Sequence, residues 1–284
     1  MRVTPSQTRY QTALQPVRIA EYSSRDLLAC ALRVQLRRMD DLFWSEFLGT
    51  AFLILLGNAT VASVLLKGSK GEGAGWLAIC VGWSSALFVA VWIAEKSGAH
   101  LNPAVSIALA SVGEFDPAKL STYIAAQFLG AAAGQLAVVF AFMPHWSNTT
   151  DPLAKRACFC NSPAIRSLGW NLISEIIATF ALVFGIMTLV QSPWVGGDSG
   201  KVSDAWSWFA FAIAGLLLVI GIGLGGATGF AINPARDLAP RIVHAIIPLA
   251  GKGESDWGYA WVPVVGPIIG AVLAAHLACS FGYC

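Results

Sequence analysis

Charged side chains are scarce in this chain of 284 residues: Asp, Glu, Lys and Arg make up 12% of it, whereas apolar residues make up 56%. A soluble globular protein carries roughly 25% charged residues. The chain therefore has too little polar surface to sit in water, and its mean hydropathy of +0.64 agrees. A formal net charge of +2, with no basic run interleaved with aromatic residues, argues against a nucleic-acid partner. The composition predicts an integral membrane protein that lies in a lipid bilayer.

Patterns that carry catalysis or bind a metal or cofactor are missing as well. No nucleophile lies beside a base, no glycine-rich phosphate loop occurs, and the six cysteines lack the spacing of a zinc site. The four histidines are scattered, with no cluster of carboxylates beside them. We therefore expect no enzyme activity, no metal and no cofactor.

Six apolar segments are long enough to cross a bilayer, which takes about 20 mostly apolar residues of helix. They are residues 43–67, 75–95, 118–143, 168–191, 206–227 and 258–281. Two further apolar stretches, residues 103–112 and 234–249, are too short to cross. The sequence predicts an all-α membrane protein with six transmembrane helices and two re-entrant half-helices.

The chain contains an internal repeat. One tripeptide occurs at residues 102–104 and again 131 residues later, and Ser45-Glu46 recurs as Ser174-Glu175 at an offset of 129. Two landmarks in the same order at nearly one offset indicate duplicated halves, at about 42–143 and 168–282. Each half holds three spans, and because three is odd the second half enters the membrane in the opposite orientation. Inverted repeats of this kind place a polar site near the midplane.

The repeated tripeptide is Asn102-Pro103-Ala104 in the first half and Asn233-Pro234-Ala235 in the second. Asparagine is a good N-cap and proline is favoured at the first helical position, so each tripeptide predicts the start of a half-helix. The preceding loops, Gly98-Ala99-His100 and Gly229-Phe230-Ala231, then cannot be helical. Irregular backbone at membrane depth is tolerated where it lines a water-filled cavity. We expect the asparagine amides and these loop carbonyls to line a pore for neutral, hydroxylated molecules.

Three charged side chains accompany this pore, and a fourth lies next to one of them. Glu46 and Glu175 are carboxylates at membrane depth, and we interpret them as acceptors for the backbone amides of the two loops, with a proton relay as the alternative. Arg236 follows the second tripeptide directly and is expected to face a polar cavity rather than lipid. Asp237, its neighbour, is expected to brace the loop as an ion partner. Together with the positive ends of two half-helices, Arg236 would oppose cations and protons.

In these motifs the chain resembles the major intrinsic protein family, the aquaporins and glycerol facilitators. The resemblance covers roughly residues 42–281 and rests on the segments SGAHLNPA and NPAR. Asp237 in NPARD, NPARDLAPR at 233–241 and GKGESDWGYAWVPVVGPIIGA at 251–271 are similar to the glycerol-conducting branch, and to its bacterial members in particular. The resemblance implies a homotetramer with one pore in each subunit, and termini in the cytoplasm.

The family's narrowest point is formed by four side chains, which the resemblance places here at Gly82, Gly221, Phe230 and Arg236. Glycine at 221, where water-selective members have histidine, leaves room for a carbon backbone, and Phe230 offers an apolar wall. The position on the second span departs from the family pattern. An ungapped count from Ser97 reaches Gly82, whereas glycerol channels often have tryptophan there, and Trp83 is the next residue. We expect Gly82 at this position, with Trp83 as the alternative.

These features predict a passive channel for glycerol and other small neutral solutes, with some water, that excludes ions and protons. A water-selective pore is one alternative, against which Gly221, Phe230 and Asp237 argue. An ion-coupled alternating-access transporter is another, because inverted repeats and broken helices occur in that class too. A membrane protein that keeps the fold with a closed pore is a third.

The N-terminal part of the chain has a different composition. The first 38 residues hold seven arginines, and by the positive-inside rule this places the N-terminus in the cytoplasm. We expect residues 1–41 to be a cytoplasmic extension ahead of a channel domain at 42–283, in a cell (plasma or inner) membrane. The extension is either disordered, or a short basic helix at the membrane surface, or not translated if synthesis begins at Met39.

Overall fold

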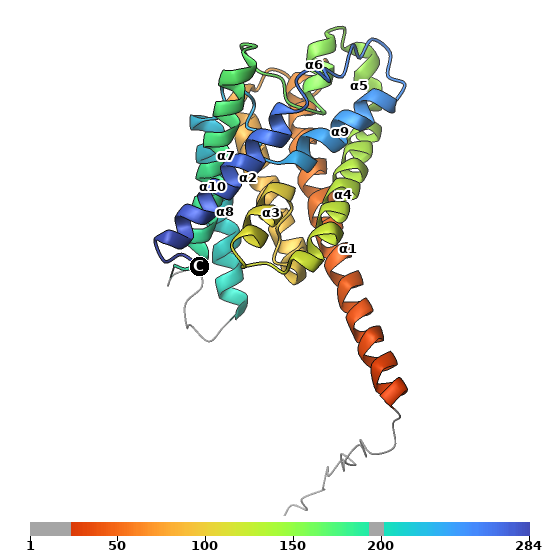
Figure 1. Cartoon of the computed structure of the whole chain (residues 1–284). Coiled ribbons are helices and arrows are strands. Elements are labelled where there is room, and N and C mark those ends of the chain that lie inside the picture. The colour runs from red at the N-terminus through yellow and green to blue at the C-terminus, as the bar shows by residue number, and fades with distance from the viewer. Residues whose placement is uncertain (1–23, 193–201) are drawn as a thin grey trace, which may run out of the picture. The chain divides into compact units, whose positions relative to one another are not determined.

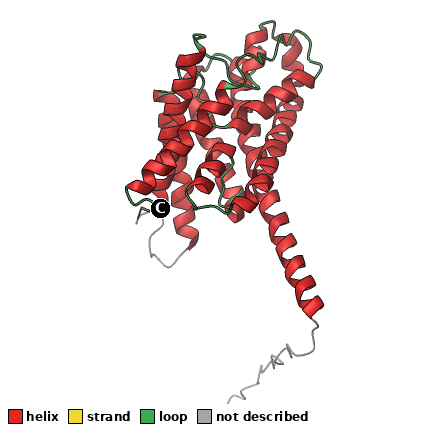
Figure 2. Ribbon diagram, in the orientation of Figure 1, coloured by secondary structure: helices red, strands yellow, loops and turns green. Residues whose placement is uncertain are grey.

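The structure is a computed structural model that describes residues 24–192 and 202–284, with side chains from Met39 onward and a gap in them at 193–205. It divides into two units, Met1–Arg38 and Met39–Cys284. Throughout the described residues the regular secondary structure is helical (Figure 2). The predicted fold class is therefore confirmed.

Six long helices hold the apolar spans. They are α1 (Ser24–Leu65), α2 (Gly75–Ile93), α4 (Leu120–Ala141), α7 (Leu168–Val190), α8 (Val202–Gly223) and α10 (Val262–Ser280). Within α1 the segment long and apolar enough to cross a membrane is Met39–Leu65. The helix reaches back to Ser24, inside the predicted extension, and the rest of that extension, residues 1–23, lies outside the described residues.

Two half-helices lie inside the second unit, as the sequence predicted. They are α3 (Pro103–Ser111) and α9 (Pro234–Ile246), and Figure 1 shows them at different levels among the long helices. Their packing is crossed: α3 of the first half lies against α10 of the second, and α9 of the second half lies against α4 of the first. The tips of both half-helices thus meet at the interface between the repeats.

Short helical segments complete the chain. Single turns of 3-10 helix lie at Glu95–Ser97, before the first re-entrant loop, and at Pro117–Lys119, before α4. The connection between the halves carries α5 (Met143–Asn148) and α6 (Pro152–Ala157). This connection ends in a loop at residues 158–167, which returns to the pore as described below.

Glycines let the outer spans approach the first span of each half. A Cβ atom at Gly134 of α4 would overlap the carbonyl oxygen of Ala51 in α1, and one at Gly270 of α10 would overlap that of Ile176 in α7. Small residues at such contacts allow helices in a membrane to pack backbone against backbone. The equivalent helix pairs of the two halves are built in the same way, and they bury Glu46 and Glu175 completely.

Candidate functional site

Both half-helices begin with the cap that the repeated tripeptide predicts. The side chain of Asn102 accepts a hydrogen bond from the amide of Ala104 at 2.9 Å, and that of Asn233 accepts one from Ala235 at 3.0 Å. Each asparagine is extended, with a φ near −155°, and each is followed by proline in the first helical turn. The capping oxygens hold the amides that point out of each helix N-terminus, where the helix dipole is positive.

The same two asparagines also tie the half-helices to each other. Asn102 Nδ2 donates to the carbonyl of Ile232 at 2.8 Å, and Asn233 Nδ2 donates to the carbonyl of Leu101 at 2.8 Å. These reciprocal bonds use one N–H of each amide group, and a primary amide has two. These two bonds leave the second N–H of each asparagine unused, and both asparagines line the central cavity.

The loops before the half-helices have an unusual backbone. Ala99 and Leu101 in the first loop have φ values of 52° and 54°, and Phe230 and Ile232 in the second have 42° and 45°. Positive φ is uncommon for residues other than glycine and costs on the order of 1–3 kcal/mol each where the surroundings enforce it. The enforcing groups are the two buried glutamates.

Glu46 of α1 organises the first loop. One carboxylate oxygen accepts from the amide of His100 at 2.9 Å and from the hydroxyl of Ser97 at 2.7 Å. The other accepts from the amide of Leu101 at 2.7 Å and from Nε2 of Gln127 at 2.8 Å. Four donors on one fully buried carboxylate satisfy a group that would otherwise be too costly to bury.

Glu175 of α7 has the equivalent place beside the second loop. Its two oxygens accept from the amides of Ala231 at 3.0 Å and Ile232 at 2.8 Å. Because both glutamates hold backbone amides on the far side of the loops, the loop carbonyls are free to turn toward the cavity. This is the geometry expected of loop supports, and neither carboxylate is among the residues that line the cavity described below.

A cavity of ≈ 250 Å³ runs between the two loops. Of the loop residues predicted to offer carbonyls, Gly98, Ala99, His100, Phe230 and Ala231 line it. Gly229, predicted with them, is not among its lining residues and lies instead against Asn161. The opposite wall is apolar and is formed by side chains of α1, α2, α7 and α8, among them Leu53, Trp83, Leu87, Leu182, Phe209, Ile213 and Leu217. The cavity thus has a polar side and an apolar side.

Arg236 and Trp83 face each other at this cavity. The guanidinium carbon of Arg236 lies 4.4 Å from the ring centroid of Trp83, within the range of a cation–π contact. Arg236 is 6% exposed, and its Nη1 has no hydrogen-bond partner among the described residues. We had expected Asp237 to be the ion partner of Arg236, but Asp237 forms its ion pair with Arg241 instead. Arg236 therefore keeps donor capacity that the described part of the protein does not use.

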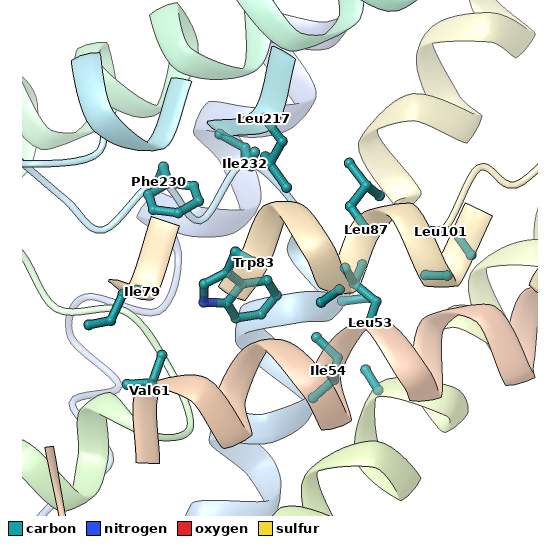
Figure 3. Close-up of a cluster of buried hydrophobic side chains, with 14 of the residues drawn as sticks. Leu53, Ile54, Val61, Ile79, Trp83, Leu87, Leu101, Leu217, Phe230 and Ile232 are labelled. Carbon is teal, nitrogen blue, oxygen red and sulfur yellow. The ribbon is translucent and has the colours of Figure 1, made fainter. Parts of the chain in front are cut away.

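Gly82, which the sequence predicted at the narrow point, does not line the cavity, whereas its neighbour Trp83 does. A Cβ atom at Gly82 would overlap the side chain of Thr60 in α1, so this position faces a neighbouring helix. One residue along a helix is a rotation of about 100°, which brings Trp83 to the cavity instead. Figure 3 shows the ring of Trp83 close to buried side chains of α1, and Phe230 of the second loop belongs to the same buried cluster. The alternative given above is the one that the structure supports.

Gly221 affects this part of the cavity through the ring of Phe230. It does not line the cavity, but a Cβ atom there would lie 3.1 Å from the tip of the Phe230 ring. The ring also packs edge-on against Trp76, with centroids 5.7 Å apart, and Nε1 of Trp76 donates to the Gly221 carbonyl at 3.1 Å. Glycine at 221 therefore decides where the Phe230 ring can lie.

The structure adds two residues that sequence reasoning missed. Arg241 is fully buried and contacts Asp237 through Nε at 2.9 Å and Nη2 at 2.8 Å. Its spacing of four residues from Asp237 on a helix was a signal that could have found it. Asn161 lies in the loop between the halves and donates its amide to Asp237 Oδ2 at 2.7 Å. No sequence pattern brings this loop residue to the pore.

Known proteins are similar to this chain over most of its length. The family described as major intrinsic protein (MIP) matches residues 36–278. The probable glycerol uptake facilitator protein of Thermotoga maritima is 47% identical over 236 residues, which cover 83% of this chain and 97% of that protein. The glycerol uptake facilitator protein of Bacillus subtilis is 43% identical over 249 residues, covering 84% and 87%.

A solved structure shares the fold as well. The aquaglyceroporin of Plasmodium falciparum superimposes with a TM-score of 0.71 at 34% identity, covering 84% of this chain and 95% of that one. The family match at residues 36–278 extends over both halves of the repeat. The chain belongs to the major intrinsic protein family.

Proposed function

We propose that this protein is a passive transmembrane channel for glycerol and other small neutral solutes, with some water, and not an enzyme. The observation that carries the proposal is the two-sided cavity: loop carbonyls, two asparagine amides and Arg236 on one side, and an apolar wall on the other. Glycerol has hydroxyls along one edge and CH groups along the other. Two relatives named as glycerol uptake facilitators and a fold neighbour named as an aquaglyceroporin support the same solute.

The narrow part of the pore is proposed to consist of Trp83, Phe230 and Arg236, with Gly221 behind the ring of Phe230. The two aromatic rings would hold the CH groups, and Arg236 with the carbonyl of Phe230 would bind the hydroxyls. A buried guanidinium with an unused N–H is stabilised when a hydroxyl accepts from it. Each passing solute would therefore exchange its hydrogen bonds with water for hydrogen bonds with Arg236 and the carbonyl of Phe230.

Ion exclusion is proposed to arise from three positive features. The N-termini of α3 and α9 each carry roughly half a positive charge, and Arg236 adds a full one. Asn102 and Asn233 are fixed as donors, because the oxygen of each caps its own half-helix. A file of water molecules crossing between them is therefore oriented and cannot relay protons freely.

We further infer the assembly and the setting from family membership. A homotetramer in which every subunit has its own pore is proposed, in a cell (plasma or inner) membrane, with residues 42–283 as the channel. The arginines of the N-terminal extension favour a cytoplasmic N-terminus, and an even number of spans puts the C-terminus on the same side.

Stopped-flow light scattering on purified protein in liposomes tests the function. An impermeant osmolyte reports water flow, and a glycerol gradient reports solute entry through re-swelling. We expect glycerol re-swelling much faster than in empty liposomes. Fast water flow without glycerol entry would mean a water-selective pore, and glycerol entry that depends on an ion gradient would mean a coupled transporter.

A matched pair of variants tests the narrow point. Trp83→Ala is expected to admit longer polyols than the parent chain does, because it removes one wall of the pore. Gly82→Ala, at the adjacent position facing Thr60, is expected to lower thermal stability without changing the solute profile. A change of the solute profile in Gly82→Ala but not in Trp83→Ala would contradict the assignment.

A further inference from the structure

Two carbonyls at equivalent places in the repeat are held by side chains from outside the repeat motif. The carbonyl of Ser97, just before the first loop, accepts from the hydroxyl of Tyr123 in α4 at 2.7 Å. The carbonyl of Thr228, 131 residues later, accepts from Nδ2 of Asn161 at 3.1 Å. Each bond fixes the last peptide group before the loop carbonyls turn toward the cavity. Asn161 therefore has the place in the second half that Tyr123 has in the first.

The backbone of Asn161 is itself fixed on both sides. Its amide donates to Oδ2 of Asp237 at 2.7 Å, and its carbonyl accepts from Nη2 of Arg241 at 2.9 Å. Asp237, the residue after Arg236, lies in the first turn of α9 and Arg241 lies one turn further on, so these bonds join Asn161 to the N-terminal half of α9. The side chain of Asn161, which is 5% exposed, thus bridges a rigid point on α9 to the loop that carries Phe230.

Asn161 also packs directly against the loop. A Cβ atom at Gly229 would lie 2.6 Å from Nδ2 of Asn161, and Gly229 has a φ of 82°. The equivalent Gly98 in the first loop has a φ of 83°, and nothing lies within 4 Å of a Cβ atom there. The close contact is therefore a feature of the second loop alone, next to the residue whose ring narrows the pore.

We propose that Asn161 is a positioning residue that sets the solute specificity of the channel. It does not line the cavity. It acts by holding the carbonyl of Thr228 away from the pore, which fixes where the Phe230 ring and the Phe230 carbonyl lie relative to Arg236. The inference rests on the proposed function, because it assigns a role in glycerol selection. Without this bond the peptide groups at Thr228 and Gly229 can rotate. The ring and the carbonyl of Phe230 are then no longer held in fixed positions relative to Arg236.

Two variants of Asn161 separate the hydrogen bond from the packing. Asn161→Leu keeps a similar volume and removes the donor, whereas Asn161→Ala removes both. In liposomes we expect each to lower glycerol permeability about fivefold, the factor that one lost hydrogen bond represents, while water permeability changes less than twofold. The matched control is Asn171→Ala, which removes an equally buried asparagine that braces residues 165–167 at the start of α7.

The control decides between a structural and a selective role. Asn171→Ala should lower the thermal stability as much as Asn161→Ala does, and it should leave the ratio of glycerol to water permeability unchanged. Equal loss of water and glycerol flux in the Asn161 variants, or an unchanged ratio, would overturn the inference. If the parent chain itself admits no glycerol, the proposed function fails. If the parent conducts glycerol and the Asn161 variants have the same ratio of glycerol to water permeability, only the inference about Asn161 fails.

Discussion

The two re-entrant loops share one backbone shape but are held by different chemistry. Glycine at Gly98 and Gly229 has nearly the same φ, and two residues with positive φ follow in each loop at the same spacing. The first loop is fixed by Glu46, whose four donors are all uncharged groups, and by the Tyr123 hydroxyl that donates to the Ser97 carbonyl. In the second loop Glu175 accepts from two backbone amides, and the loop is fixed in addition from the connection between the halves.

The charges are as unequal as the hydrogen bonds. The first half has Val105 and Ser106 where the second has Arg236 and Asp237, and Arg241 has no charged counterpart in α3. Arg241 also donates to the carbonyls of Ser255 and Asn161, so it ties two segments to α9. We propose that the symmetric backbone forms the pore, whereas the asymmetric side chains select what passes. A guanidinium at the narrow point requires a rigid frame, and the second half supplies one.

The largest loss of stability is expected when the buried ion pair between Asp237 and Arg241 is broken. Arg241→Met should destabilise the fold by about 3–5 kcal/mol, because it leaves the buried carboxylate of Asp237 without its charge partner. Thermal unfolding of the detergent-solubilised protein measures this loss. The double variant Asp237→Asn with Arg241→Met should be more stable than the single one. Arg166→Met is the control: Arg166 is half exposed in its pair with Asp256, and its loss should cost about 1 kcal/mol or less. Equal losses in the two arginine variants would contradict the role given to the buried pair.

The next largest effect is expected from removing the charge of Glu46 or Glu175, the carboxylates that hold the two loops. Glu46→Gln should cost more stability than Glu175→Gln, because an amide can accept through only one atom and turns its NH2 group toward donors. At Glu46 this leaves two of four donors unpaired, and at Glu175 one of the two backbone amides, at about 1–3 kcal/mol for each unpaired group. Thermal unfolding of both variants, run in parallel, gives the order. A larger loss at Glu175 would mean that the second loop depends on its carboxylate more than on Asn161 and α9.

A third change makes the second half resemble the first at the pore. Arg236→Val places at this position the residue type found at Val105 and removes the full positive charge. Leak of cations or protons through the channel should rise about tenfold, a change that corresponds to roughly 1.4 kcal/mol, while glycerol flux persists. A pH-sensitive dye inside liposomes reports the proton leak under a potential. Unchanged leak would assign ion exclusion to the half-helix N-termini and the asparagines alone.

Much of this architecture could be predicted from the sequence because its signals are local. The two Asn-Pro-Ala tripeptides carry their own N-caps and first-turn prolines, and the apolar spans have the length a bilayer requires. Glu46 and Glu175 were recognisable because a carboxylate at membrane depth needs donors. In each of these cases the physical cause lies within a few residues of the signal.

The errors arose where the cause lies in another element. The ungapped count from Ser97 reached Gly82, but whether Gly82 or Trp83 faces the cavity depends on how α2 is rotated against α1, which packs Gly82 against Thr60. The pairing of Asp237 with Arg241 was missed in favour of its neighbour Arg236. Asn161 had no signal at all, because only the folded chain brings a loop between the halves against Thr228.

The smallest effect is expected at the partner of Asn161 in the first half. Tyr123→Phe removes the hydroxyl that donates to the Ser97 carbonyl, but the ring still packs against His100 and Phe115. Ser97 also keeps its hydroxyl bond to Glu46, so the loss should be about 1 kcal/mol, with no change in the ratio of glycerol to water permeability. Tyr259→Phe is the matched control, because the buried Tyr259 hydroxyl has no hydrogen-bond partner among the described residues and its removal should cost nothing. If Tyr123→Phe changed the permeability ratio as strongly as Asn161→Ala, selection would be a property of both loops, and the division between a symmetric pore and an asymmetric filter would not hold.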